Sequence, residues 1–266
     1  MSFSVYRKIA NLILLLVASN LSAQVTYYDA AEFQLLGKAT AATTERYVRL
    51  PDSLEHVSRL PLWQLSRNSS GMAVRFRSNS TQVAVKWESL VNFHMDHMTD
   101  VAVKGLDLYC LEGKNWYFVN SARPIGKSTE SSLISGMEAK EREFMIYLPL
   151  YDGLVSLSIG IDAGASINQP AIESPVREKP VVFYGTSILQ GGCASRPGMA
   201  HTNIISRRLN RECINLGFSG NAFLDLGVAQ VMAGVDAGVF VLDFVPNVTV
   251  EQMNERMEKF YRILRD

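Results

Sequence analysis

The segment that most restricts the fold of this chain is a short apolar run that ends in Gly-Thr-Ser. It reads Val181-Val182-Phe183-Tyr184-Gly185-Thr186-Ser187-Ile188. An apolar run followed at once by glycine and hydroxyl residues is typical of a buried strand that ends in a tight turn. In open α/β sheets, the carboxyl ends of the strands carry ligands and catalytic groups. Ser187 is therefore a candidate nucleophile. The simpler interpretation is that this serine only caps the next helix.

Two more apolar runs follow, at residues 213–216 and 238–245, and they end in Gly217-Phe218-Ser219-Gly220-Asn221 and in Pro246-Asn247. Amphipathic stretches at residues 200–210 and 224–233 separate the three runs, and a last helix is expected at residues 250–265. Strands that alternate with helices predict a parallel sheet with right-handed crossovers. The turns after all three strands would then meet at one edge of the sheet.

This meeting of turns suits the chemistry of acyl transfer. A tetrahedral intermediate needs a nucleophilic oxygen and fixed hydrogen-bond donors for the developing oxyanion. The backbone N–H groups of Ser187 and Gly220 and the side-chain amide of Asn247 would supply three donors. Each of these residues also has an ordinary role as a turn residue, so the prediction depends on their joint placement after three successive strands.

These three blocks resemble the motifs of the SGNH (GDSL-like) hydrolases in order and in spacing. The resemblance implies that Ser187 is the nucleophile and that Ser187, Gly220 and Asn247 form the oxyanion hole. Thr186 stands where many members of the family have aspartate. The chain also contains Gly105-Leu106-Asp107-Leu108-Tyr109, which resembles the Gly-x-Asp-Leu-Tyr signature of an N-terminal β domain in one bacterial branch. The resemblance covers the sequence from about Tyr47 onward.

One family motif is missing from the sequence. The fourth block, Asp-x-x-His, implies the general base and the acid that orients it, and no histidine follows His201. A doubly wound hydrolase domain of this kind needs about 150 to 200 residues, and residues 180–266 offer about half of that. We therefore expect that the chain is truncated and that the catalytic base lies in sequence not present here.

Four further residues near the motifs are candidates to line the pocket: Thr186, Ile188, His201 and Asn221. A helix-start role is the simpler interpretation of His201. His94 and His97 resemble a metal or catalytic pair, but His-x-x-His is a weak signal outside a helix, and a loop role is preferred. No metal site and no cofactor are predicted.

The N-terminus has the pattern of a secretory signal, with Arg7 and Lys8 before an apolar run at residues 9–17 and Ala23 at the expected cleavage point. We predict a secreted or periplasmic protein without stable membrane insertion after cleavage, because the run is too short to span a bilayer. The formal net charge of +0 argues against nucleic-acid binding.

Short alternating segments predict a jelly-roll-like β-sandwich over residues 24–163. A linker at residues 164–179 would follow, and then the first part of a three-layer α/β/α, flavodoxin-like hydrolase domain at residues 180–266. The expected strands cover residues 72–77, 82–87, 106–111, 116–119, 144–148 and 155–161, with a polar loop at 128–135. Asp107 and Tyr109 would share one face of a strand, where they could meet the hydrolase domain.

The sequence leaves several points open. Cys110, Cys193 and Cys213 are an odd number of cysteines, and unpaired thiols are preferred over a disulfide framework. Trp63, Trp87 and Trp116 could be platforms for sugars, although core positions are the better interpretation for at least two of them.

The predicted function is a secreted serine esterase that cleaves acyl esters, acetyl esters first among them, on small molecules or carbohydrates. Without its base, this chain is expected to be weakly active or inactive. The alternative is a non-catalytic carbohydrate-binding or adhesion protein with a remnant hydrolase half. A true lipase is a third possibility, which the lack of an amphipathic lid sequence disfavours.

Overall fold

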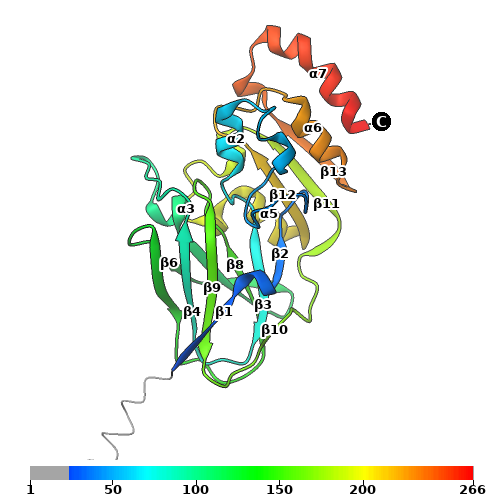
Figure 1. Ribbon diagram of the computed structural model, residues 1–266. Coiled ribbons are helices and arrows are strands. Elements are labelled where there is room, and N and C mark those ends of the chain that lie inside the picture. The colour runs from blue at the N-terminus through cyan, green and yellow to red at the C-terminus, as the bar shows by residue number, and fades with distance from the viewer. Residues whose placement is uncertain (1–23, 266) are drawn as a thin grey trace, which may run out of the picture.

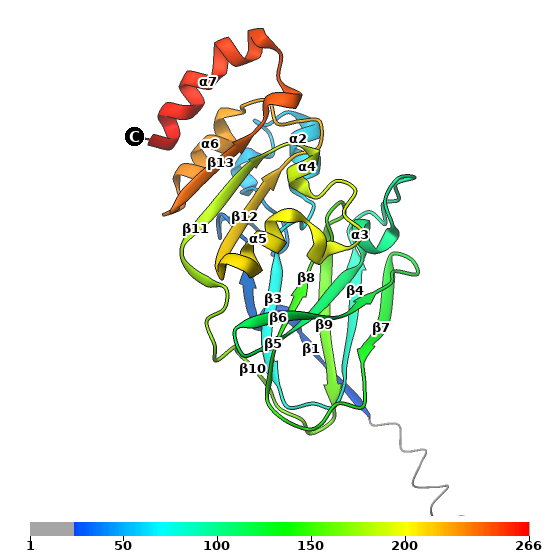
Figure 2. The same ribbon diagram turned by 180° about the vertical axis from the view of Figure 1, so that it is seen from behind.

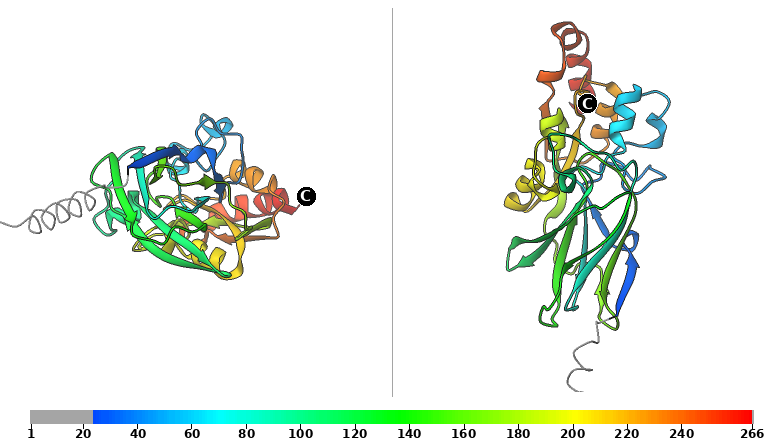
Figure 3. Two further views of the ribbon diagram at one scale, coloured as in Figure 1. Left: turned by 90° about the horizontal axis from the view of Figure 1, so that it is seen from below. Right: turned by 90° about the vertical axis from the view of Figure 1, so that its left-hand side faces the viewer.

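The computed structural model describes residues 24–265, so the predicted signal segment at residues 1–23 lies outside the described part. Two bodies lie end to end along the long axis of the molecule: a β-sandwich and a smaller α/β layer structure (Figure 1). Figure 3 shows the same arrangement from two further sides, with the helices gathered at one end of the sandwich. The all-β plus α/β architecture predicted from the sequence is confirmed.

The β-sandwich consists of two antiparallel sheets. The first has the order β1 (Val25–Asp29), β9 (Leu154–Asp162), β4 (Val83–Ser89), β7 (Ser128–Ile134). The second has the order β10 (Ile167–Asn168), β3 (Ala73–Ser78), β8 (Arg142–Tyr147), β5 (Leu106–Glu112), β6 (Asn115–Ala122), and β2 (Gln34–Leu36) also pairs with β3. Alternate residues of each strand point inward and form one apolar core between the sheets, with Phe76, Val85 and Phe144 fully buried.

The α/β part contains a three-stranded parallel sheet with the order β12 (Arg211–Gly217), β11 (Val176–Gly185), β13 (Val239–Asp243). The parallel pairing predicted for the three apolar runs is confirmed. Four helices follow these strands: α4 (Ser187–Gln190), α5 (His201–Leu209), α6 (Leu226–Ala233) and α7 (Val250–Arg265).

Successive residues of β11 face opposite sides of the sheet, which explains why the whole strand is apolar. Val182 and Tyr184 pack with α6 and α7, whereas Phe183 packs on the side of α5 (Figure 2). The helices therefore cover both faces of the sheet.

Short helices connect the larger elements. They are η1 (Ala30–Glu32), η2 (Asp52–Leu54), α2 (Leu60–Ser66), α3 (Asp100–Lys104), η3 (Pro197–Met199) and η4 (Val245–Asn247). Pro61 lies in the first turn of α2, where a backbone N–H would have no acceptor inside the helix. The Thr99 hydroxyl caps α3 by accepting from Ala102 N at 3.2 Å.

A segment between β2 and β3 of the sandwich belongs to the core of the α/β part. Leu50, Leu54, Leu62 and Trp63 lie in the same buried cluster as Tyr184. The division at residues 164–179 stays a prediction, and the packing adds an earlier segment of the chain to the α/β core.

The fully buried Arg49 fixes this segment to the parallel sheet. Its guanidinium donates to Leu65 O at 2.6 Å and Asn68 O at 3.0 Å, near the end of α2. It also donates to Gly217 O at 2.6 Å and Asn215 O at 3.3 Å on β12, and lies 4.7 Å from the centre of the Phe218 ring. One cationic side chain thus connects two elements that are far apart in sequence.

The structure corrects one expectation from the sequence. The polar stretch predicted as a loop contains the whole of β7, which pairs with β4 and buries only Thr129 and Leu133. All three tryptophans, Trp63, Trp87 and Trp116, are buried, at 7%, 2% and 8% exposure, which agrees with the core positions preferred for at least two of them and leaves none as a platform for sugars. The residues predicted as a linker contain β10, which pairs with β3, and the first residues of β11, which begins at Val176.

The cysteines Cys110, Cys193 and Cys213 are all unpaired, as preferred from the sequence. None of the helices formed by residues 24–265 combines the length and the apolar character that crossing a membrane requires.

Candidate active site

The three strand ends that carry the sequence motifs lie side by side. In β11, Gly185 pairs with Gly217 of β12 on one side and with Asp243 of β13 on the other. Thr186 N donates to Asp243 O at 3.1 Å, and Phe218 N donates to Gly185 O at 2.7 Å, so the three turns leave the sheet at the same level. Because the strands are parallel, all three turns lie at the carboxyl edge of the sheet.

Ser187 is the first residue of α4 and is partly exposed. Its carbonyl oxygen accepts from Gly192 N at 2.7 Å and from the Tyr151 hydroxyl at 3.2 Å. Within residues 24–265, neither its backbone N–H nor its Oγ has a hydrogen-bond partner. The N–H groups of a first helical turn have no acceptor inside the helix, so this donor stays free beside the hydroxyl.

The glycines of the turn after β12 have different roles. A Cβ on Gly217 would collide with the backbone of Gln190, so the close passage of α4 over the strand end requires glycine. Gly220 has φ +64° and is exposed, and a Cβ there would meet no atom within 4 Å. Gly220 is needed for its left-handed backbone, and its N–H has no acceptor among the described residues.

Asn247 ends η4, after β13, and its side chain is held in one orientation. Its Oδ1 accepts from Ala222 N at 3.2 Å. Because the oxygen of the amide is engaged, the Nδ2 group points away from this contact, and it has no acceptor in the described part of the chain. The same hydrogen bond connects the turn that holds Gly220 to the turn that holds Asn247.

Gln190 is the residue that sequence reasoning missed. It is fully buried at the end of α4. Its Oε1 accepts from Ser219 N at 2.9 Å, and its Nε2 donates to Leu150 O at 3.0 Å. One side chain therefore joins the serine helix, the glycine turn and the β-sandwich. No motif marked this position, and only its place three residues after Ser187 could have suggested it.

The four residues predicted to line the pocket have different positions. Ile188 is 63% exposed beside Ser187. Thr186 is buried, and its hydroxyl donates to Asp243 Oδ2 at 3.3 Å. Asn221 supports the turn, since its Oδ1 accepts from Arg59 Nη1 at 2.8 Å and its Nδ2 donates to Ser219 O at 2.9 Å.

His201, the fourth of these residues, begins α5 and is partly buried. Burial lowers the pKa of its imidazole, and the carboxylate of Asp243 opposes this effect. The side chain is therefore neutral at pH 7. It has no hydrogen bond to Ser187 in the described residues, so the structure does not pair it with the serine.

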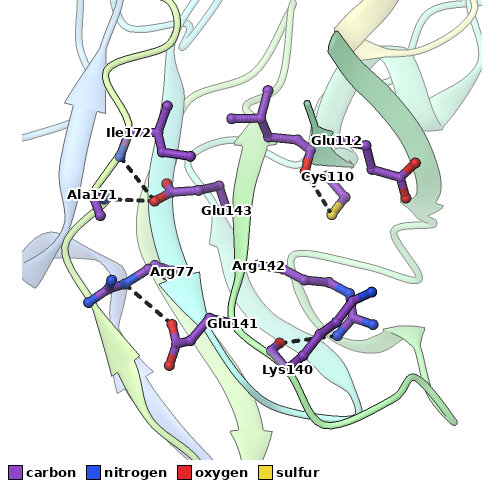
Figure 4. Close-up of a pocket in the computed structure, with 10 residues that line it drawn as sticks. Arg77, Cys110, Glu112, Lys140, Glu141, Arg142, Glu143, Ala171 and Ile172 are labelled. Carbon is purple, nitrogen blue, oxygen red and sulfur yellow. Dashed lines mark hydrogen bonds and ion pairs between the residues drawn. The ribbon is translucent and has the colours of Figure 1, made fainter. Parts of the chain in front are cut away.

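Two other features lie apart from the three motifs. His94 Nδ1 is 2.7 Å from Asp100 Oδ1, and no group of three metal-binding side chains occurs within residues 24–265. A cavity of about 610 Å³ opens on the β-sandwich (Figure 4). Its charged side chains are largely paired with neighbours: Arg77 Nε lies 3.3 Å from Glu141, and Glu143 accepts from Ala171 N at 2.7 Å. This cavity contains none of the motif residues.

Two family models match the chain. Residues 25–167 match the GxDLY domain, described as the N-terminus of SGNH-hydrolase-type esterases, and residues 178–266 match the GDSL-like lipase/acylhydrolase family. No curated protein is significantly similar to the chain in sequence.

Among solved structures, a GDSL-like lipase candidate from Bacteroides ovatus ATCC 8483 is 38% identical, with a TM-score of 0.86, and the match covers 91% of this chain and 71% of that one. A salicylyl-acyltransferase from a tetracycline biosynthetic pathway shares the fold at 16% identity and a TM-score of 0.67, with 92% and 68% covered. A family two carbohydrate esterase from Cellvibrio japonicus also shares the fold, at 9% identity and a TM-score of 0.55. That match covers 91% of this chain and 75% of the esterase.

Proposed function

Because this chain belongs to the GDSL-like lipase/acylhydrolase family and carries the N-terminal domain of SGNH-type esterases, we propose that it is a serine esterase that hydrolyses acyl esters. One observation carries the proposal. Three N–H donors that have no acceptor among the described residues, those of Ser187, Gly220 and the Asn247 amide, follow three adjacent strands at the edge where the Ser187 hydroxyl lies.

In the proposed reaction, Ser187 Oγ attacks the carbonyl carbon of the ester, and its proton passes to a general base. The negative oxygen of the tetrahedral intermediate accepts hydrogen bonds from the three donors. When the intermediate collapses, the protonated base gives its proton to the departing oxygen, so the alcohol leaves and an acyl group stays on Ser187 Oγ. Water then hydrolyses this acyl ester, which releases the carboxylic acid and restores the serine. Such donors are effective because the fold holds them in place before the reaction begins.

Residues 24–265 do not place a general base within hydrogen-bond contact of the Ser187 hydroxyl. Since no described histidine is hydrogen-bonded to Ser187, we propose that the general base comes from outside these residues. The 266-residue chain alone is then expected to turn over slowly, because loss of one member of a catalytic triad lowers the rate by several orders of magnitude.

The proposed substrates are acyl esters of carbohydrates, with acetyl as the first acyl group to test. The likeness of the fold to a carbohydrate esterase supports this choice of substrate class. We also propose that the protein acts outside the cytoplasm after cleavage behind Ala23. N-terminal sequencing of the exported protein tests that cleavage. Neither nucleic acid nor stable membrane insertion has a part in the proposal.

The test is hydrolysis of p-nitrophenyl acetate and of an acetylated xylo-oligosaccharide by the full chain, with mass spectrometry of the acylated protein. Ser187→Ala is expected to abolish both turnover and acylation. Ser195→Ala is the matched control, because Ser195 is an exposed serine in the loop that follows α4, and it should retain both. Turnover that survives Ser187→Ala would refute the proposal. Glycan binding without any acylation would favour the non-catalytic alternative.

A further inference from the structure

Asp107 of the Gly-x-Asp-Leu-Tyr segment reaches out of the β-sandwich and holds a loop of the α/β part. Asp107 lies on β5 and is fully buried. Its Oδ2 accepts from Arg196 Nη1 at 2.7 Å and from Gly198 N at 2.8 Å. Its Oδ1 accepts from the Ser121 hydroxyl on β6 at 2.6 Å. A buried carboxylate is costly unless it is paired, and here both oxygens are engaged.

Arg196 completes the contact with two aromatic residues of the same sheet. Its Nη1 also donates to the Tyr109 hydroxyl at 2.7 Å, and its guanidinium lies 3.7 Å from the centre of the Phe118 ring. A planar guanidinium can bind a carboxylate and stack on an aromatic ring at the same time. We call Asp107, Tyr109, Phe118, Ser121 and Arg196 the interdomain clamp.

The clamp holds residues 191–200, which connect α4 to α5. Ser187 begins α4 at one end of this loop, and His201 begins α5 at the other. Gly192 N donates to Ser187 O at 2.7 Å, so the first residues of the loop contact the nucleophile residue directly. The loop contains the short helical turn η3, and contacts with the sandwich add to the hydrogen bonds that it makes within the α/β part.

Other contacts of the loop support the clamp along its length. Ser195 O accepts from the Thr99 hydroxyl at 2.7 Å, and Gly198 O accepts from Arg207 Nη2 at 2.8 Å. A Cβ on Gly198 would collide with the Tyr109 ring, so the loop lies directly on β5. Its backbone is thus bound by side chains of both bodies.

We propose that the interdomain clamp positions the loop behind the nucleophile and that Asp107 is a positioning residue for the reaction. This inference rests on the proposed esterase function. Asp107 cannot itself touch substrate, because it is fully buried and its oxygens are occupied. It acts through the loop: a displacement of about 1 Å at a reacting group can lower a rate about a hundredfold. The β-sandwich is then part of the active-site framework.

Asp107→Asn in the full chain tests the proposal, because it keeps the size of the side chain and replaces one acceptor by an N–H donor. Amide hydrogen exchange of residues 191–200 should speed up about tenfold or more, since hydrogen bonds to a charged group are among the strongest in proteins. Asp162→Asn is the matched control: Asp162 is the last residue of β9, which ends on the side of the sandwich away from the α/β part (Figure 1), and it accepts hydrogen bonds from Thr81 and Gln82. It should leave exchange in the loop unchanged.

A second pair of variants keeps the test decisive if Asp107→Asn does not fold. Arg196→Gln should speed exchange in the loop, and Arg196→Lys should restore part of the protection, because a lysine can still pair with Asp107. In ester hydrolysis, Asp107→Asn should lower kcat and leave KM nearly unchanged.

The two proposals can fail separately. Faster exchange confined to residues 191–200, in a chain whose Ser187 is never acylated by the ester substrates, would leave the clamp standing and refute the esterase function. Unchanged exchange in both Asp107→Asn and Arg196→Gln would refute the clamp, whether or not the wild type is active. Faster exchange spread evenly over the whole chain would also refute it, because the residue would then only stabilise the fold.

Discussion

Replacement of Arg49 by methionine should strongly destabilise the α/β part. The guanidinium is fully buried and donates to four backbone carbonyls. None of its described hydrogen-bond partners is a carboxylate. Burial lowers the pKa of Arg49 to about 9, so the side chain is still a cation at pH 7. Methionine fills much of the same volume and removes every donor.

The magnitude follows from two opposing effects. Each hydrogen bond to a charged group contributes about 1.5 to 3 kcal/mol, so loss of the four bonds of Arg49 is a large unfavourable change. Methionine avoids the desolvation of an ion, which costs several kcal/mol. Asn68 O, which has no other partner among the described residues, loses its hydrogen bond. We expect a net loss of about 3 to 4 kcal/mol in unfolding free energy, and a melting temperature about 10 °C lower.

Urea denaturation followed by tryptophan fluorescence measures this change, since Trp63 lies in the same buried cluster as Phe218. Arg46→Met is the control: Arg46 is partly buried, and its side chain makes one described hydrogen bond, to Phe33 O at 2.6 Å. It should cost about 1 kcal/mol. A loss below 1 kcal/mol for Arg49→Met, or one no larger than for Arg46→Met, would refute the reasoning.

Two further predictions concern the candidate site. Burial lowers the pKa of His201 in the folded protein, with Asp243 opposing the effect, so the unfolded chain binds the proton first as pH falls below about 6.5. Acidification from pH 7.5 to 5.5 should therefore destabilise the wild type more than His201→Asn. Unfolding free energies of both proteins at the two pH values measure this difference, and equal losses would contradict the prediction. Gly220→Ala should cost about 1 kcal/mol for its left-handed backbone alone, whereas Gly217→Ala must displace Gln190 and should cost about 3 kcal/mol. Thermal denaturation ranks the two glycine variants, and the reverse order would be evidence against the assigned roles.

The parallel sheet could be predicted because each of its strands is a short apolar run that ends in glycine or proline. β7 could not, because its sequence Ser128-Thr-Glu-Ser-Ser-Leu-Ile is mostly polar and only two of its side chains are buried. Tertiary pairing with β4 outweighs its weak local preference for a strand.

In the candidate site, the motif residues were predictable because each follows a strand. Their supports were not. Gln190 and Arg49 carry no local pattern, and their roles appear only when backbone groups from distant segments lie within hydrogen-bond distance. That Asp107 and Tyr109 share one face of their strand could be predicted, because alternate side chains of a strand point to the same side. The structure confirms that both contact the hydrolase part, through Arg196.

The order of synthesis gives the buried segment around Leu50, Leu54 and Leu62 a particular consequence. This segment leaves the ribosome more than a hundred residues before β11, the strand against which its cluster packs. Its apolar side chains then have no native partner until the last part of the chain has been made. The sandwich and the α/β part are therefore not interchangeable modules: a gene fusion that exchanged one of them at the predicted linker would leave the new hydrolase half without part of its own core.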